Sequence, residues 1–579
     1  MCGILGVRRS WRDDPAAFRR AVDAMAWRGP DGSRVLEVDD WRLAVARLAI
    51  SDPGNDQPIA DPDGRRVALF NGAVTSAAEE WRRHGASART RNDAELALLR
   101  LREAGETGFV RTSGPCAAAV LDLGGDRLWL LRDRAGEKPF YAVRAGGRIV
   151  AFASTPASLR ALGLACRLTP QSQGRLLRFG FAPPEFEPEP AGAVFAVEGA
   201  LRGDRDGVTA LPVPEQPGAP REFRGRVVDA AGRAAAADVP LGLCLSGGLD
   251  SSCLAVAVAE GGRSLPAYQF RAAGEPEDER RNAARVAERT GHRLRPVDAG
   301  PEILDRLPAL TRACGLPLGD PSVLAVHALA QAARADGVKV LLSGEGADDL
   351  WLGYRRHRLA RWLPRTGVPG LPRPGFATGL AARAWRALTG ARPYDELLAV
   401  APPGFLAAVL AEGGSGQAEL PASHPRATAL ARARYVDRHL YLRHDLLPKL
   451  DTATMAAGVE GRCPYLDPVL LDAPETHAPD ARALLGKRPL RRAFARDLPR
   501  EVVRAGKRGF LVPLDRWLRE DSWLAALLRE PRTLERPHLR GAGVRAMLEL
   551  HLRGRARLGH PLYLLAAWEV YLRTLEEPA

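Results

Sequence analysis

Short apolar segments and two helical stretches alternate along the first part of the chain. Helical patterns cover residues 15–26 and 94–103. The apolar segments, which have the length of β-strands, cover residues 65–70, 117–121, 127–131 and 148–152. This mixture predicts an α+β domain in the N-terminal part of the chain.

From about residue 221 the pattern changes, and strands alternate with long amphipathic helices. Residues 239–245 and 338–342 are apolar runs of strand length, and each leads into a loop rich in Ser, Gly and Asp. Residues 253–259 and 280–290 can form helices. This alternation predicts an α/β domain with a parallel sheet and helices on both of its faces.

A Pro-rich segment separates the two regions. Residues 211–220 read Leu-Pro-Val-Pro-Glu-Gln-Pro-Gly-Ala-Pro, a composition that favours an extended linker. With 579 residues the chain is long enough for two domains with substantial cores. The predicted division is therefore a first domain over 1–203, a linker over 204–220 and a second domain over 221–579.

The basic residues are strongly biased. The net charge is +14, which raises the hypothesis of a nucleic-acid partner. However, the Arg residues are scattered, without a basic tail or block, so no nucleic-acid partner is expected. Of the 83 basic residues only five are Lys. Where nearly every cation is Arg, a remaining Lys is expected to stand at a position that needs its compact ammonium. Four of the five lie in recognisable motifs: Lys138, Lys449, Lys487 and Lys507.

The seven cysteines have no paired spacing and no CxxC motif. Free thiols in a reducing compartment are therefore expected. No apolar run approaches the ~18 residues that a membrane span needs. These features predict a cytoplasmic protein without a membrane partner, and the sequence leaves a homodimer possible.

The segment Ser246-Gly247-Gly248-Leu249-Asp250-Ser251-Ser252 follows an apolar strand and precedes a helix. Backbone N–H groups at such a turn suit a phosphate chain, and the glycines allow close approach. No Lys follows the glycines, so the segment is not a Walker loop. It resembles the pyrophosphate loop of N-type ATP pyrophosphatases. The residues expected at ATP are Leu245, Ser246, Gly247, Gly248, Asp250, Ser251, Ser252, Ser343, Gly344 and Lys449.

Cys2 would carry a free α-amine after removal of Met1, and that amine could act as the base for its thiol. Downstream segments begin at Arg28, Arg47, Asn71 and Thr90. In order and spacing they resemble the glutaminase domain of class II glutamine amidotransferases. Together the two motifs resemble glutamine-hydrolysing asparagine synthetase over nearly the whole chain.

This resemblance implies a four-layer αββα sandwich of the Ntn-hydrolase type and specific roles in the first domain. Cys2 would attack the glutamine amide, while the Asn71 amide and the Gly72 N–H would stabilise the oxyanion. Arg47 would bind the glutamine α-carboxylate and Asp93 its α-ammonium. The alternative for Arg47 and Asp93 is a surface ion pair.

The first domain departs from the family at two places. Asn71-Gly72 is followed by Ala73-Val74-Thr75-Ser76 instead of the usual Glu-Ile-Tyr-Asn, and Trp27 stands where a His is common. These changes leave the nucleophile and the oxyanion donors in place. They affect the expected grip on glutamine and the coupling between the two sites.

The second domain has its own predicted site. The strand at 338–342 ends in a loop with Glu345 and Asp348, which should face the Ser246–Ser252 loop. Asp250 and Asp348 could then hold Mg²⁺ beside the ATP phosphates. The alternative for Asp348 is a helix cap. By resemblance, Lys487 would stabilise the leaving pyrophosphate.

The sequence therefore predicts an ATP-dependent enzyme that adenylates a carboxylate and transfers glutamine-derived ammonia to it. Aspartate is the default acceptor, giving asparagine, with Glu345 near the reacting ammonia. Glu345 resembles the asparagine-forming branch, since lactam-forming relatives tend to place Tyr there, but Asp349 replaces the usual Glu. The alternatives are an amidotransferase or macrolactam (lasso-type) cyclase acting on another carboxylate, and a non-enzymatic basic scaffold.

Overall fold

The computed structural model describes residues 2–52, 54, 56–85, 88–215, 222–272, 277–364, 377–411, 419–421, 428–473, 481–506, 512–520 and 522–577. The motif at Lys507 and residues 216–220 of the predicted linker lie outside this described part of the chain. Within it, no helix is both long and apolar enough to span a membrane.

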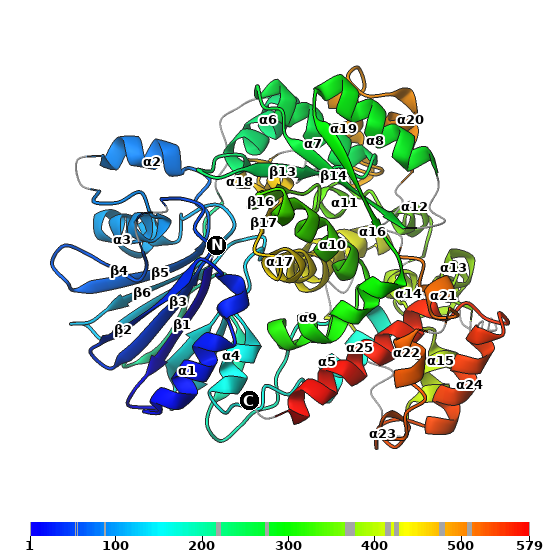
Figure 1. Cartoon of the computed structure of the whole chain (residues 1–579), viewed down its shortest axis with the longest axis horizontal. Helices are drawn as coiled ribbons and strands as arrows, with labels where there is room; N and C mark the ends of the chain where they lie inside the picture. The colour runs from blue at the N-terminus through cyan, green and yellow to red at the C-terminus, as the bar shows by residue number, and fades with distance from the viewer. Residues whose placement is uncertain are drawn as a thin grey trace.

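The N-terminal part contains two antiparallel six-stranded sheets that face each other (Figure 1). Side chains such as Ile4, Leu43, Leu69 and Leu130 fill the space between them. The first sheet, ordered β10-β8-β9-β1-β3-β2, comprises β1 (Cys2–Arg8), β2 (Gly32–Val38), β3 (Trp41–Arg47), β8 (Tyr141–Ala145), β9 (Arg148–Ala153) and β10 (Ala193–Ala196). The second, ordered β12-β11-β7-β6-β5-β4, comprises β4 (Ile59–Ala60), β5 (Arg66–Gly72), β6 (Cys116–Asp122), β7 (Arg127–Arg132), β11 (Ala200–Asp204) and β12 (Gly207–Leu211).

Helices cover the outer face of each sheet. On the first sheet lie α1 (Pro15–Asp23) and α4 (Pro156–Ala161). On the second lie α3 (Asp93–Phe109) and, against α3, α2 (Ala77–His84). The layers run helix, sheet, sheet, helix, which confirms the αββα sandwich. The division at residue 203 stays a prediction, and β12 falls within the segment that was expected to be a linker.

The second part is built on a parallel five-stranded sheet ordered β15-β14-β13-β16-β17. This confirms the expected α/β fold. The strands are β13 (Leu241–Cys244), β14 (Pro266–Ala272), β15 (Arg293–Ala299), β16 (Val340–Leu342) and β17 (Glu460–Arg462). In Figure 1, α6 (Phe223–Ala234), α7 (Leu249–Glu260) and α8 (Glu277–Thr290) lie above this sheet, and α10 (Ser322–Ala335) and α17 (Leu447–Met455) lie below it.

The order of the strands places a topological switch point between β13 and β16, where open α/β sheets bind ligands beyond the strand ends. The loops after these two strands are the ones that begin at Ser246 and Ser343. The helix after β13 begins at Leu249, with Gly248 as its N-cap, several residues earlier than the sequence pattern indicated. Asp250 and Ser251 therefore lie in the first turn of α7 and not in a loop.

The remaining helices form a region around the parallel sheet, and some of them pack against α6 and α7. The described stretches within residues 357–430, where no motif was recognised, belong to this region. Its helices are α9 (Leu307–Cys314), α11 (Ala347–Leu350), α12 (Arg355–Ala360), α13 (Leu380–Thr389), α14 (Pro393–Leu398), α15 (Pro403–Val409), α16 (Ala429–Val436), α18 (Pro468–Leu471), α19 (Arg488–Phe494), α20 (Arg500–Arg504), α21 (Leu514–Trp517), α22 (Trp523–Leu527), α23 (Pro531–Leu534), α24 (Gly541–Leu552) and α25 (Gly559–Glu576).

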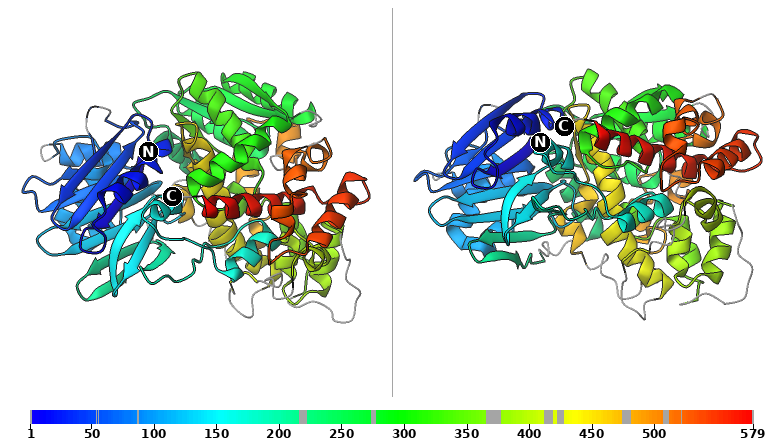
Figure 2. Two further views of the ribbon diagram at one scale, coloured as in Figure 1. Left: turned by 60° about the horizontal axis from the view of Figure 1, so that its bottom comes forward. Right: turned by 90° about the horizontal axis from the view of Figure 1, so that it is seen from below.

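The two parts lie side by side in both views of Figure 2. The C-terminal helix α25 packs against α9 and against α5 (Pro170–Phe179), which comes from the N-terminal 203 residues. Contacts between the parts are therefore spread along the chain.

Candidate active sites

The first candidate site surrounds Cys2 at the start of β1. Cys2 pairs in register with Arg47 on β3 and is 4% exposed. Its backbone nitrogen donates a hydrogen bond to Asn71 Oδ1 at 3.1 Å. The other end of that amide, Asn71 Nδ2, is buried and has no hydrogen-bond partner among the described residues. Asn71 thus holds the backbone nitrogen of Cys2 with one atom and leaves a donor for a further group.

Gly72 follows Asn71 at the end of β5, where the backbone needs a glycine. Its φ is +134°, and a Cβ there would lie 1.9 Å from the Pro115 carbonyl oxygen. A larger residue would displace this corner of the strand, together with Asn71. The predicted oxyanion donors are therefore fixed by close backbone packing.

Asp93 is the first residue of α3, and its side chain lies in a cavity of about 480 Å³. Its Oδ2 accepts a hydrogen bond from Val74 N at 3.4 Å. Burial raises the pKa of Asp93 to about 7. We call this space the Asp93 cavity; Arg233 and Arg462 of the second domain also line it. Arg462 acts on Asp93 from a distance, but no described residue forms an ion pair with it. This buried carboxyl group therefore suits a ligand that brings an ammonium group.

Arg47 is engaged elsewhere in this structure. Its guanidinium contacts the Asp56 carboxylate and donates to the Asp52 carbonyl oxygen at 2.6 Å. Neither Arg47 nor Cys2 lines the Asp93 cavity. The structure therefore brings Cys2, Asn71 and Gly72 together. Asp93 is joined to Val74, two residues after Gly72, by a hydrogen bond. Arg47 does not point toward Asp93.

The second candidate site lies at the switch point of the parallel sheet, in a cavity of about 500 Å³. We call it the Lys487 cavity. Gly247 has φ +82°, and a Cβ there would lie 2.3 Å from the Glu279 carbonyl oxygen. The N-terminal end of α7 faces the same space, so its N–H groups favour an anion. The predicted residues that line it are Leu245, Ser246, Gly247, Gly248, Asp250, Ser251, Ser343, Gly344, Glu345 and Lys487.

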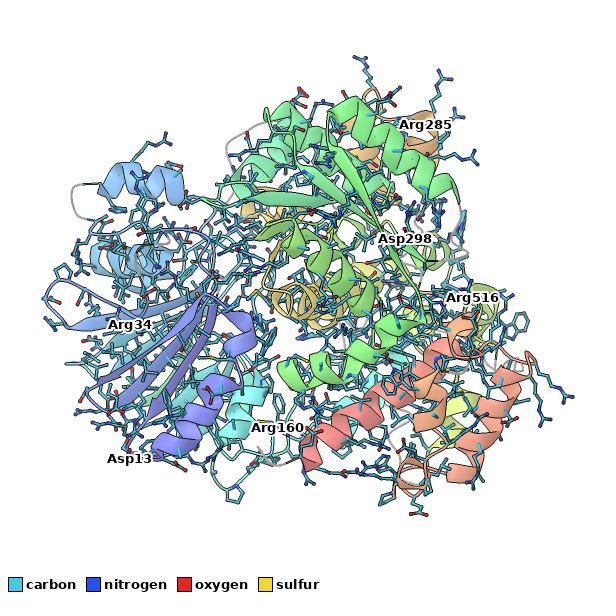
Figure 3. The ribbon with its side chains drawn as sticks, in the orientation of Figure 1. Asp13, Arg34, Arg160, Arg285, Asp298 and Arg516 are labelled. Carbon is cyan, nitrogen blue, oxygen red and sulfur yellow. The ribbon has the colours of Figure 1, made fainter. Side chains whose placement is uncertain are left out.

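Three predicted residues lie outside this lining. Ser252 is fully buried within α7, and Lys449 faces a different cavity. Asp348 does not line the cavity itself but contacts Lys487, which does. At the outer side, Arg285 on α8 lines the Lys487 cavity together with Glu501, 3.8 Å away. Arg285 is labelled in Figure 3. Arg285 was not predicted from the sequence, because one Arg among so many carries no signal.

Lys487 joins the two predicted metal ligands. Its Nζ lies 2.7 Å from Asp250 Oδ2 and 2.8 Å from Asp348 Oδ1. Lys487 has a left-handed backbone with φ +59°, and a Cβ at Gly353 would lie 2.6 Å from Lys487 Cε and 1.9 Å from Asp348 Oδ1. The two carboxylates therefore converge on a point that already stabilises a cation. Such a donor pair fits Mg²⁺, which typically takes one or two carboxylates together with phosphate oxygens.

Glu345 extends the Lys487 cavity toward a second lysine. Its Oε1 lies 3.0 Å from Lys449 Nζ, which also lies 3.4 Å from Asp320 Oδ2. Burial opposes the charge on Lys449, but Glu345, Asp320 and Asp445 outweigh it and raise the pKa of Lys449. Lys449 is therefore charged and holds Glu345 in place. Asp349, which replaces a usual Glu, is buried and contacts the Tyr354 hydroxyl at 3.3 Å.

A third cavity, of about 70 Å³, lies between the two domains. We call it the interdomain cavity. Glu137 and Arg28 line it from the first domain, and Asp320 and Lys449 from the second. Because roughly 10–15 Å³ of such volume suffices for one water, it has room for several molecules of that size. Lys138, which the scarcity of Lys singled out, donates to the Gly461 carbonyl oxygen at 3.1 Å across the same boundary.

Arg28 and Asp451 contact each other across this boundary, and sequence reasoning missed the pair. They are 423 residues apart. Each belongs to a sequence motif, but no local pattern shows which distant residue it contacts. A second pair, Glu460 and Arg462, is internal to the second domain, with a distance of 3.0 Å between the buried side chains. Burial alone would raise the pKa of Glu460, but Arg462 lowers it to about 2.

Comparison with known families agrees with both halves of this arrangement. Residues 222–573 match the family model for asparagine synthase, and residues 1–190 match that for a glutamine amidotransferase domain. The chain therefore belongs to the asparagine synthase family. This family uses ATP, and membership supports an ATP-dependent ligase that hydrolyses glutamine and transfers its nitrogen.

Individual relatives cover most of the chain. One is asparagine synthetase [glutamine-hydrolyzing] 1 of Bacillus subtilis, 26% identical over 595 residues, with 92% of this chain and 90% of the relative covered. Another is the putative asparagine synthetase [glutamine-hydrolyzing] of Mycobacterium tuberculosis, 29% identical over 598 residues, with coverage of 90% and 88%. Asparagine synthetase of Asparagus officinalis is 27% identical over 380 residues, with coverage of 61% and 60%.

Proposed function

We propose that this chain makes asparagine from aspartate, with ammonia released from glutamine and with cleavage of ATP to AMP and pyrophosphate. The observation that carries the proposal is the interdomain cavity, which reaches Glu137 on the Asp93 side and Lys449 on the Lys487 side. Lys449 contacts Glu345, which lines the Lys487 cavity. Two equipped sites and a space between them fit a reaction that passes ammonia from one site to the other.

In the first site, Cys2 would attack the glutamine side-chain amide and form a thioester, releasing ammonia. The α-amine of Cys2, held by Asn71 Oδ1, would take the thiol proton and pass it to the leaving nitrogen. Asn71 Nδ2 and the Gly72 N–H would stabilise the oxyanion. Asp93 would bind the α-ammonium of glutamine, and Arg47 would bind its α-carboxylate after giving up its contact with Asp56.

In the second site, the Ser246–Ser251 turn would bind the ATP phosphates through backbone N–H groups. Asp250 and Asp348 would hold Mg²⁺, which neutralises phosphate charge when bound. Lys487, released from these two carboxylates, would stabilise the negative charge of the departing pyrophosphate as the acyl-adenylate forms.

Ammonia would then attack the acyl-adenylate carbonyl carbon, and AMP would leave. The attacking nitrogen must lose a proton, and Glu345 would accept it. Lys449 would hold the Glu345 carboxylate in position for this transfer. Aspartate is proposed as the acceptor because Glu345 stands at the position where lactam-forming relatives tend to place Tyr.

Product analysis tests this proposal. The enzyme is incubated with glutamine, ATP, Mg²⁺ and a panel of carboxylates that includes aspartate and a peptide. Asparagine formed with an equal amount of AMP supports the proposal. Amide or lactam formation only from another carboxylate would favour the macrolactam alternative, and no amide product with any acceptor would contradict ligase activity altogether.

A further inference from the structure

Glu137 lies between two cavities. It lines both the Asp93 cavity and the interdomain cavity, and no other described residue lines both. It belongs to the loop between β7 and β8, in the motif that contains the rare Lys138. Its side chain is 6% exposed, so the accessible part faces the interior. The function proposed above assigns this residue no role.

Both domains fix the position of Glu137. Its backbone N donates to Asp133 Oδ1 at 2.9 Å within the first domain. Its Oε2 accepts a hydrogen bond from the backbone N of Cys463, in the second domain, at 3.2 Å. A carboxyl group has further acceptor capacity, so Oε1 can serve another donor. The side chain is therefore held at the junction while one oxygen can bind a ligand.

The surroundings favour the uncharged form of Glu137. Burial and the nearby Asp133 raise the pKa of Glu137 to about 8, against the opposing effects of Lys138 and the Cys463 N–H; Glu460 adds to the rise. A protonated carboxyl both donates and accepts a hydrogen bond. Ammonia, which has N–H donors and one lone pair, can use both.

Much of the remaining wall of the interdomain cavity offers no such partner. It includes Leu168, Leu176, Phe181, Leu316, Leu318 and Val323. A polar molecule that leaves water for apolar surroundings loses free energy unless a hydrogen bond compensates it. A fixed polar group at the junction lowers that cost at the point of entry.

We propose that Glu137 binds ammonia as it passes from the Asp93 cavity into the interdomain cavity. The inference rests on the proposed function, because it needs ammonia produced at Cys2 and consumed near Glu345. It adds a specific ammonia-binding residue to that route. The hydrogen-bonding capacity of the side chain, and not its charge, is what the role requires.

The test measures where the product nitrogen comes from. Enzyme, aspartate, ATP and Mg²⁺ are mixed with glutamine labelled with ¹⁵N in its amide and with excess unlabelled ammonium, and the ¹⁵N fraction of the amide product is read by mass spectrometry. If the panel described above identifies another acceptor, that acceptor replaces aspartate. The variants are Glu137→Leu, which removes the polar atoms, and Glu137→Gln, which keeps an acceptor for Cys463 N and a donor. The control is Glu189→Leu, because Glu189 also accepts backbone N–H groups and lines neither cavity.

We expect a several-fold drop in the ¹⁵N fraction with Glu137→Leu, and wild-type fractions with Glu137→Gln and Glu189→Leu. Glutamine hydrolysis and synthesis from free ammonia should stay unchanged in all three. A wild-type ¹⁵N fraction in Glu137→Leu would overturn the inference, as would an equal loss of synthesis from free ammonia, which would mark a purely structural role. If the wild-type enzyme forms no amide, the proposed function fails, and this result is distinct from either of those.

Discussion

Arg28 of the first domain and Asp451 of the second form a buried ion pair with two contacts. Nη1 lies 2.7 Å from Oδ2 and Nη2 lies 3.1 Å from Oδ1, with both side chains at most 2% exposed. The Nε of Arg28 also donates to the Cys2 carbonyl oxygen at 3.4 Å. One guanidinium thus links the backbone of the proposed nucleophile to α17, the helix that carries Lys449.

The first prediction concerns this pair. Asp451→Ala would leave the Arg28 guanidinium buried without its partner, which should lower the free energy of unfolding by about 3–5 kcal/mol. Denaturant titration measures the change. The control is Lys339→Ala, which breaks the partly exposed Lys339–Asp31 pair across the same boundary and should cost less than about 1 kcal/mol. Equal losses in the two variants would contradict the importance of the buried pair.

The second prediction separates the two sites. Cys2→Ala should abolish synthesis from glutamine, because the thiol would serve only the first site. Synthesis from free ammonia should survive, since ammonia can reach the second site directly. Both rates are measured as amide product over time. Glutamine-dependent synthesis by Cys2→Ala at the wild-type rate would show that another group is the nucleophile.

A third prediction concerns pH. Because burial raises the pKa of Asp93 to about 7, the free enzyme protonates this carboxyl as the pH falls through neutrality. The proposed contact with the glutamine α-ammonium needs the ionised form, so kcat/KM for glutamine should fall about tenfold per pH unit below the pKa and level off above it. Asp93→Asn should raise KM and remove this dependence. If the pH dependence of kcat/KM persists unchanged in Asp93→Asn, the titrating group is not Asp93.

The fourth prediction concerns the carboxylates around Lys487. Asp250→Asn and Asp348→Asn should each remove most synthesis and most ATP cleavage, because each removes a proposed Mg²⁺ ligand. Glutamine hydrolysis at the first site should change little. Calorimetric titration with ATP and Mg²⁺ should show weaker binding in both variants. Wild-type affinity in both would place the nucleotide elsewhere.

Local features of the fold and of the sites were predictable from the sequence. The Ser246–Ser251 turn depends on neighbouring residues, so an apolar strand, two glycines and a helix indicate it without knowledge of the rest. The early start of α7 was missed because Gly248 caps the helix with its backbone conformation and leaves no side-chain signal. An ion pair was the alternative considered for Arg47, but the sequence did not identify Asp56 as the partner, because a guanidinium selects among several nearby acceptors only in three dimensions.

Contacts between the domains were not predictable. Arg28 lies in a short helical turn of the first domain and Asp451 lies in α17 of the second. They come together because the two domains pack against each other, and no periodicity of the sequence encodes that packing. The scarcity of lysine partly replaced the missing sequence signal. It singled out four lysines, of which Lys507 lies outside the described residues. The other three, Lys138, Lys449 and Lys487, are buried among carboxylates or carbonyl oxygens.

The central claim is that glutamine nitrogen reaches an aspartyl-adenylate beside Glu345, and one measurement tests it most directly. Purified enzyme is given aspartate, ATP, Mg²⁺ and glutamine labelled with ¹⁵N in its amide, and asparagine, AMP and ADP are quantified for the wild type and for Glu345→Gln. The account predicts ¹⁵N-asparagine and AMP in equal amounts from the wild type. Glu345→Gln should lose most synthesis while its glutamine hydrolysis remains. Formation of ADP and phosphate, or ATP cleavage with a peptide but no asparagine from aspartate, would contradict it.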